Sequence, residues 1–130
     1  MGVRQFFRGV VISLTFTALL LGSQSSHAAG DPKRGADTFA QDCAVCHSVM
    51  QGKNKMGPSL FAIVGRKAGS VADFVYSEAM KQSDIIWTSD KLDAYIAKPK
   101  LLVPGDKMSF SGIAEEKERE DLIAYLNTLR

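Results

Sequence analysis

The stretch Cys43-Ala44-Val45-Cys46-His47 holds both cysteines of the chain and one of its two histidines. Cysteines three residues apart lie on one face of a helix, about one turn from each other. The imidazole of the next residue lies within reach of the same face. The stretch therefore predicts a site where two sulfur atoms and one ring nitrogen meet a single bound group.

Two common kinds of cysteine site do not fit the rest of the sequence. A redox-active disulfide of the thioredoxin type requires a βαβ unit, and no such pattern surrounds the pair. A zinc site normally requires a fourth ligand from Cys or His, and residues 29–130 contain no other. The pattern C-x-x-C-H is the attachment signature of c-type haem. We therefore predict one haem, bonded covalently to Cys43 and Cys46 and ligated by His47.

Residues 1–28 have the layout of a secretory signal peptide. Arg4 and Arg8 give a positive start, residues 9–22 form an uncharged apolar run, and residues 26–28 fit a small-x-small cleavage site. The apolar run is shorter than the roughly 20 residues of a membrane span. We expect cleavage and export to the periplasm, with an uncleaved anchor as the alternative.

Cleavage would leave residues 29–130 as one formally neutral domain. It removes Arg4 and Arg8 from the 16 basic residues and none of the 14 acidic residues. The strong basic excess that is typical of nucleic-acid-binding proteins is therefore absent. Cleavage also removes His27, which leaves His47 as the only histidine. A second histidine ligand from the same chain is thus excluded.

Helical patterns mark both ends of this domain. Asp31 suits an N-cap and Pro32 suits the first helical position. Apolar residues then recur at helical spacing up to the cysteine pair: Ala36, Phe39, Ala40 and Cys43. The same spacing recurs near the C-terminus: Leu122, Tyr125, Leu126 and Leu129. A third helix is predicted to start at a Ser89 cap, to stop before Pro99, and to bury Leu92, Tyr95 and Ile96.

Turns and long loops are predicted between these helices. They are marked by Gly52, Gly57-Pro58, Gly65, Gly69, Pro104-Gly105 and Gly112. No segment shows the alternating pattern of a strand, so the prediction is a small all-α domain of three to five helices. Long loops are uncommon in a compact domain unless they serve a function, and a few short helices make a thin core. We therefore expect the loops to wrap around one large apolar cofactor.

The sixth ligand of the iron has to be a methionine, a lysine or an open position. Four methionines lie in residues 29–130: Met50, Met56, Met80 and Met108. The first two follow the attachment motif within ten residues, too near to reach the other face of a haem easily. Of the other two, Met108 has the better setting, because a Pro104-Gly105 turn directs its loop and Phe110 can cover the haem edge. Thioether ligation is a standard choice that raises the reduction potential, so we predict Met108.

The chain resembles class I cytochrome c, the mitochondrial type and its bacterial periplasmic relatives of the cytochrome c2 kind, over nearly all of residues 30–130. The resemblance is carried by an ordered series of residues: Gly35, Phe39, Cys43, Cys46, His47, Gly57-Pro58, Gly65-Arg66, Tyr76, Trp87, Tyr95, Pro99, Pro104-Gly105, Lys107-Met108, Leu122 and Tyr125. It implies a single-haem electron carrier that is not an enzyme. It also implies a monomer without stable membrane insertion.

The resemblance implies roles for residues around the iron. The carbonyl of Pro58 would accept a hydrogen bond from the far nitrogen of His47 and fix its tautomer. Tyr95 would lie beside the sulfur of Met108. Gly35 would lie where the terminal helices cross.

On the propionate side, the resemblance implies that Tyr76 and Trp87 donate hydrogen bonds and that Arg66 supplies a counter-charge. The chain departs from the family at Asp106, where a hydroxyl donor is usual. Because an ionised Asp cannot donate a hydrogen bond, this side chain turns outward, stays protonated or leaves a propionate less satisfied. Met80 stands where a polar Asn is usual, which should make the pocket drier.

The resemblance predicts that single electrons pass from quinol-cytochrome c reductase to a terminal oxidase or a photosynthetic reaction centre. The family places five lysines around the haem edge: Lys53, Lys55, Lys98, Lys100 and Lys107. Such a charge asymmetry steers weak, fast encounters. Asp42 and the sequence Ala114-Glu115-Glu116 replace residues that are commonly basic in mitochondrial forms. The alternative function is a haem peroxidase or gas sensor with a labile Met108 bond, although no distal His or Arg is evident.

Overall fold

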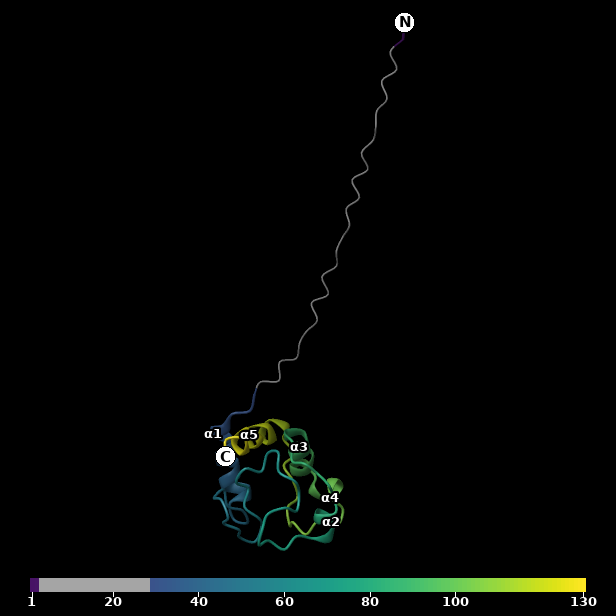
Figure 1. Ribbon diagram of the computed structural model, residues 1–130. Coiled ribbons are helices and arrows are strands. Elements are labelled where there is room, and N and C mark those ends of the chain that lie inside the picture. Colours follow the sequence, from purple (N-terminus) through teal and green to yellow (C-terminus); the bar gives the residue numbers. More distant parts are fainter. Residues whose placement is uncertain (3–28) are drawn as a thin grey trace.

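The computed structural model describes residues 1–2 and 29–130, and the second range forms a helical domain (Figure 1). Its helices are α1 Pro32–Thr38, the π-helical turn η1 Phe39–Cys43, α2 Glu78–Lys81, α3 Ser89–Ala97, α4 Pro99–Leu102 and α5 Glu116–Leu126. Among the described residues, extended pairing is limited to one isolated bridge between Lys67 and Ile86. The all-α prediction is confirmed.

The predicted signal peptide falls almost entirely on residues 3–28, which lie outside the described residues. Within the described part of the chain, no helix is both long enough and apolar enough to span a bilayer.

Helix α1 begins at the predicted cap and runs directly into η1. The side chain of Asp31 accepts a hydrogen bond from the backbone N–H of Lys33 at 2.8 Å, and Pro32 occupies the first turn. The turn of η1 is wider than an α-helical turn, because the N–H of Ala44 donates to the carbonyl of Phe39 at 2.9 Å. Ala40 is exposed, contrary to the predicted apolar face. A regular 3.6-residue period cannot place residues correctly across a π-turn.

Helices α1 and α5 cross at Gly35. A Cβ atom on Gly35 would lie 1.9 Å from the carbonyl oxygen of Asp121 and 2.8 Å from the Cβ of Tyr125, so only glycine permits this approach. The ring of Phe39 packs against that of Tyr125, with centroids 5.7 Å apart. Leu122 is 1 % exposed. The crossing therefore closes one side of the core, as the resemblance to class I cytochrome c implied.

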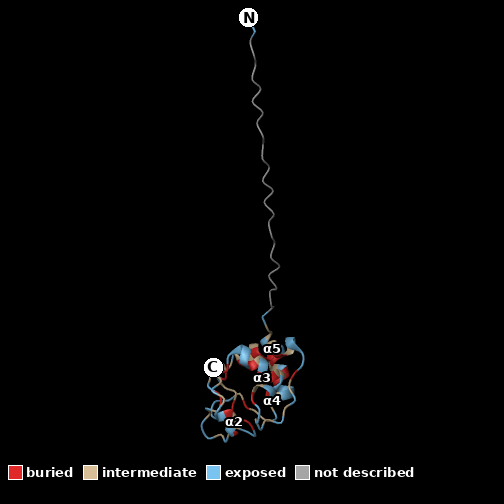
Figure 2. Ribbon diagram, turned by 90° about the vertical axis from the view of Figure 1, so that its right-hand side faces the viewer, coloured by how far each residue is buried: buried red, intermediate tan, exposed pale blue. Residues whose placement is uncertain are grey.

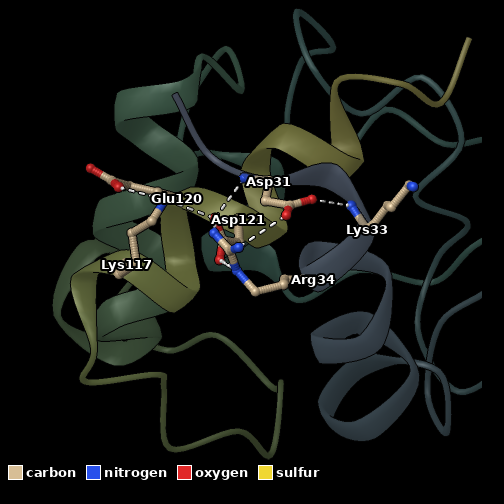
Figure 3. A network of polar contacts seen from close by, with 6 residues as sticks. All are labelled: Asp31, Lys33, Arg34, Lys117, Glu120 and Asp121. Carbon is tan, nitrogen blue, oxygen red and sulfur yellow. Dashed lines mark hydrogen bonds and ion pairs between the residues drawn. The ribbon is translucent and has the colours of Figure 1, made fainter. Parts of the chain in front are cut away.

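An ion-pair network ties the start of α1 to α5 (Figure 3). The Asp121 carboxylate, 5 % exposed, accepts from the backbone N–H of Asp31 at 2.6 Å, from Nε of Arg34 at 2.7 Å and from Nζ of Lys117 at 2.9 Å. The Arg34 hydrogen bond is the main cause that holds the pKa of Asp121 well below its usual range. The network therefore joins the two ends of the domain through one buried charge.

The N-cap of helix α3 is one residue earlier in the chain than predicted. The hydroxyl of Thr88, not that of Ser89, accepts from the backbone N–H of Lys91 at 3.2 Å. The predicted inner face is confirmed, since Leu92, Tyr95 and Ile96 are buried. Pro99 does follow the end of α3, and it also begins the short helix α4, because proline suits a first helical turn.

The core draws on loops as much as on helices. Figure 2 shows buried residues concentrated on α3 and α5, with further buried positions along the loops. Buried core residues outside the helices are Ile63, Ala68, Trp87, Val103 and Ile113. Gly112, at φ 100°, lets its loop approach the end of α3 closely, since a Cβ atom on Gly112 would lie 2.1 Å from the carbonyl oxygen of Ala97. The long loops thus supply part of the buried core.

Candidate haem site

An apolar cavity lies between α3, α5 and the surrounding loops. It holds about 1040 Å³ of empty space, including its opening to solvent, at the upper end of what is usual for ligand pockets. Every residue that the sequence analysis assigned to the haem or its iron lines it: Cys43, Cys46, His47, Pro58, Arg66, Tyr76, Trp87, Tyr95, Met108 and Phe110. The fold thus gathers these residues around one space.

Met80, which was expected to make the pocket drier, also lines the cavity. The remaining residues of the wall were not assigned to the site from sequence: Asp42, Leu60, Ile63, Leu92, Ile96, Ser109, Leu122 and Leu126. Helical spacing marked the members of α3 and α5 as buried, but it did not show what they face. Leu60 and Ile63 lie in a loop without periodicity, so no sequence signal singled them out.

His47 is fixed beyond the end of η1. Its backbone N–H donates to the carbonyl of Cys43 at 2.9 Å, and its Nδ1 lies 2.7 Å from the carbonyl oxygen of Pro58. A carbonyl can only accept, so Nδ1 carries the proton and Nε2 keeps a free lone pair. Burial lowers the pKa of His47; the Pro58 contact opposes this, and the charges of Arg66 and Lys55 add to the lowering. The imidazole is therefore neutral at pH 7 and able to ligate a metal.

Gly57 permits the close approach of the Pro58 loop to this imidazole. Its N–H donates to the carbonyl of Cys46 at 2.8 Å. A Cβ atom at Gly57 would lie 2.3 Å from Cε1 and 2.7 Å from Nδ1 of His47. No larger residue fits without moving the ring.

Cys43 and Cys46 are free thiols that face the cavity. Burial is the main cause that raises the pKa of Cys43 to about 11, and the charges of Asp42 and Cys46 add to it. Redox-active thiols have lowered pKa values. The environment of Cys43 therefore argues against a reactive dithiol and suits a sulfur buried beside an apolar group.

Met108 reaches the cavity from the loop that follows α4. Its backbone N–H donates to Oδ1 of Asp106 at 3.2 Å, and its Sδ lies 3.9 Å from the hydroxyl of Tyr95. That hydroxyl also donates to Oδ2 of Asp106. The half-buried Asp106 side chain is thus turned towards Tyr95, which excludes the outward orientation. Burial, and then the Asp106 carboxylate, raise the pKa of Tyr95, so the phenol stays protonated.

Arg66, Tyr76 and Trp87 lie around the same space. The guanidinium of Arg66 donates to the carbonyls of Phe61 at 2.8 Å and Ser59 at 2.9 Å. Burial lowers the pKa of Arg66 and raises that of Tyr76, yet an arginine remains charged. Trp87 is 5 % exposed. A half-buried cation, a phenol and an indole therefore line this part of the cavity.

The five lysines predicted to dock partners lie outside the cavity wall. All are exposed: Lys53, Lys55, Lys98, Lys100 and Lys107. Lys55 donates to the carbonyl of Ala44, inside the attachment motif. Lys100 donates to the carbonyl of Asp106, in the loop that carries Met108. Two of the five charges thus lie beside the segments that supply the candidate ligands.

The donor set fits a covalently attached haem. Two thiols, a neutral imidazole and a thioether line one apolar cavity. In the described part of the chain, no group of three or more His, Cys, Asp or Glu side chains could hold a metal ion directly. Every buried polar side-chain atom described there has a hydrogen-bond partner. The cavity therefore suits an iron held by a porphyrin better than a bare ion.

Residues 32–130 match the family model described as Cytochrome c. The chain belongs to the cytochrome c family. It is 49 % identical over 100 residues to cytochrome c of Gibberella zeae, covering 76 % of this chain and 94 % of that protein. It is 46 % identical over 101 residues to cytochrome c2 of Rhodopila globiformis, covering 78 % and 95 %.

A solved structure supports the same cytochrome c fold. Cytochrome cH from Methylobacterium extorquens superposes with a TM-score of 0.72 at 44 % identity, covering 76 % of this chain and 99 % of that one. The resemblance to class I cytochrome c and the predicted fold are both confirmed. As a member of the cytochrome c family, the chain carries one covalent haem c and serves electron transport.

Proposed function

We propose that this chain shuttles single electrons between membrane complexes in the periplasm, from quinol-cytochrome c reductase to a terminal oxidase or a photosynthetic reaction centre. The observation that supports this proposal is that Cys43, Cys46, His47 and Met108 all line one apolar cavity. Closed ligation on both sides of the iron would bind no substrate, so this function needs no catalytic residue. The predicted signal peptide, residues 1–28, would supply the export.

The roles of the chain's own residues follow from this geometry. Cys43 and Cys46 would form the two thioether links, and His47 and Met108 would be the axial ligands. Haem, when bound, supplies an iron that gains and loses one electron. The carbonyl of Pro58 keeps the imidazole in one tautomer and orientation. The apolar wall excludes water, so the surroundings reorganise little when the charge changes.

The attachment and the export are tested together on the product purified from a periplasmic fraction. Its intact mass should equal that of residues 29–130 plus one haem, and its visible spectrum should be that of a haem with a nitrogen and a sulfur ligand. A colourless product with the mass of the bare polypeptide would contradict both.

The Met108→Ala variant is expected to open the iron. Because removal of the thioether should leave one coordination position of the iron open, the reduced variant should bind carbon monoxide at a concentration that leaves the native protein unchanged, as followed by the visible spectrum. Met56→Ala is the matched control, because Met56 is 72 % exposed and does not line the cavity. If the reduced native protein binds carbon monoxide readily, the rival function of a peroxidase or gas sensor is favoured.

Docking through the lysines is tested by neutralising the two that contact the segments supplying the candidate ligands. The pair Lys55→Gln with Lys100→Gln should slow electron transfer with isolated reductase or oxidase about tenfold at low ionic strength. The effect should fade as salt is added, because exposed charges are screened. Lys33→Gln with Lys91→Gln is the control, removing two exposed lysines in the first turns of α1 and α3. Equal rates for both pairs would remove Lys55 and Lys100 from docking.

A further inference from the structure

The Tyr95 hydroxyl has one proton and two acceptors within reach. It donates to Oδ2 of Asp106, and it lies 3.9 Å from the sulfur of Met108. A carboxylate oxygen is a much stronger acceptor than a thioether sulfur. The Tyr95 hydroxyl therefore donates its hydrogen bond to Asp106, and its contact with the Met108 sulfur is only a weak one.

The arrangement is held from several sides. Oδ1 of Asp106 accepts from the backbone N–H of Met108 at 3.2 Å, so both carboxylate oxygens are engaged. The backbone N–H of Asp106 donates to the carbonyl of Val103 at 3.0 Å, and its carbonyl accepts from Nζ of Lys100. The ring of Tyr95 packs against that of Trp87, with centroids 4.9 Å apart. Both partners of the hydrogen bond thus have fixed positions.

We propose that Asp106 is a positioning residue that lowers the reduction potential, by drawing the Tyr95 proton away from the Met108 sulfur and by placing a negative charge beside that ligand. The proposal rests on the proposed function, in which Met108 ligates the iron. It goes beyond that function because it assigns to Asp106 and Tyr95 the tuning of the iron's affinity for an electron.

Both effects act in the same direction. A sulfur lone pair that accepts no hydrogen bond donates more fully to the iron and stabilises the oxidised, more positive form. A carboxylate near the ligand stabilises the same form through its charge. Hydrogen bonding around an axial ligand is one of the ways in which a protein adjusts a haem potential.

The variant Asp106→Asn separates the two acceptors at nearly constant shape. Its amide oxygen can still accept from the N–H of Met108, so its NH₂ group faces Tyr95 and donates to the phenol oxygen. The hydroxyl proton is then free to turn towards the sulfur, and the negative charge is gone. The midpoint potential, measured by redox titration of the holoprotein, should rise. Asp84→Asn is the control for charge alone, because the Asp84 side chain is 83 % exposed and should leave the potential nearly unchanged.

The variant Tyr95→Phe tests the direction of the hydrogen bond independently. If the hydroxyl donates to Asp106, removing the hydroxyl leaves the sulfur as it was, and the reduction potential should change little. If the hydroxyl donates to the Met108 sulfur, removing it should lower the reduction potential clearly, which overturns the proposal. In the Tyr95→Phe background, Asp106→Asn should raise the potential less than in the native protein, because only the charge effect remains.

The outcomes distinguish this inference from the proposed function. Met108→Ala first establishes whether the sulfur ligates the iron, through carbon monoxide binding and the spectrum. With ligation intact in Asp106→Asn by the same spectrum, an unchanged or lowered potential overturns the inference and leaves the electron-carrier function standing. If Asp106→Asn does not accumulate as holoprotein, Tyr95→Phe alone decides, since it removes one oxygen atom and no charge.

Discussion

The variant Gly57→Ala is expected to lose about 3 kcal/mol of unfolding free energy as holoprotein and to weaken ligation by His47. The new methyl group would lie 2.3 Å from Cε1 of the imidazole. The ring cannot move away easily, because Nδ1 of His47 is hydrogen-bonded to the carbonyl of Pro58 and its backbone N–H to the carbonyl of Cys43. Denaturant titration should show the lost stability, and the visible spectrum should show a fraction of iron without its nitrogen ligand.

Gly52→Ala is the matched control for this change. Gly52 lies in the same loop at φ 68°, and a Cβ atom there would meet nothing within 4 Å. Its substitution therefore costs backbone strain of about 1 kcal/mol without touching the imidazole. A Gly57→Ala protein no less stable than Gly52→Ala, with an unaltered spectrum, would show that the loop yields freely at this point.

The variant Gly35→Ala is expected to destabilise the domain although it improves a helix. Alanine is favoured over glycine inside a helix by about 1 kcal/mol. Against this, a Cβ atom 1.9 Å from the carbonyl oxygen of Asp121 forces α1 and α5 apart, and overpacking of this kind costs about 3 kcal/mol. The net loss should be about 2 kcal/mol, seen as a lowered thermal midpoint of the holoprotein.

Asp37→Ala provides the comparison on the same helix. Asp37 is exposed in α1, so its replacement changes helix propensity without adding a contact at the crossing. This variant should be about as stable as the native protein or slightly more stable. If Gly35→Ala also gained stability, the close approach of the two terminal helices would be refuted.

Local patterns were enough to place most of the helices. The Asp31 cap, the Pro32 start and the inner face of α3 depend on residues within one or two turns, and sequence patterns report such neighbours well. Ala40 was misplaced because the π-turn adds a residue to the helical period. The short helices α2 and α4 were not predicted, since four residues are too few to show a period.

The site could be predicted as far as its motifs carried chemistry. The spacing of C-x-x-C-H predicts covalent haem attachment, and the series from Gly57 to Met108 matches the family in order. The orientation of Asp106 was left open, because it depends on where Tyr95 lies in space and not on any neighbour in sequence. The loop residues Leu60 and Ile63 were missed for the same reason.

The Asp121 network makes the joint between the chain's two ends sensitive to acid. The pKa of Asp121 is lowered in the folded state, so this carboxylate takes up a proton at a higher pH in the unfolded chain than in the folded one. The contribution of this carboxylate is complete above its unfolded pKa, about 4, and declines as the pH falls towards its folded pKa. Because the exposed partners Arg34 and Lys117 keep their charge throughout that range, protonation of Asp121 removes the anion that these two cations share. Acid would therefore begin to part the first and last helices before it disturbed the apolar walls of the cavity.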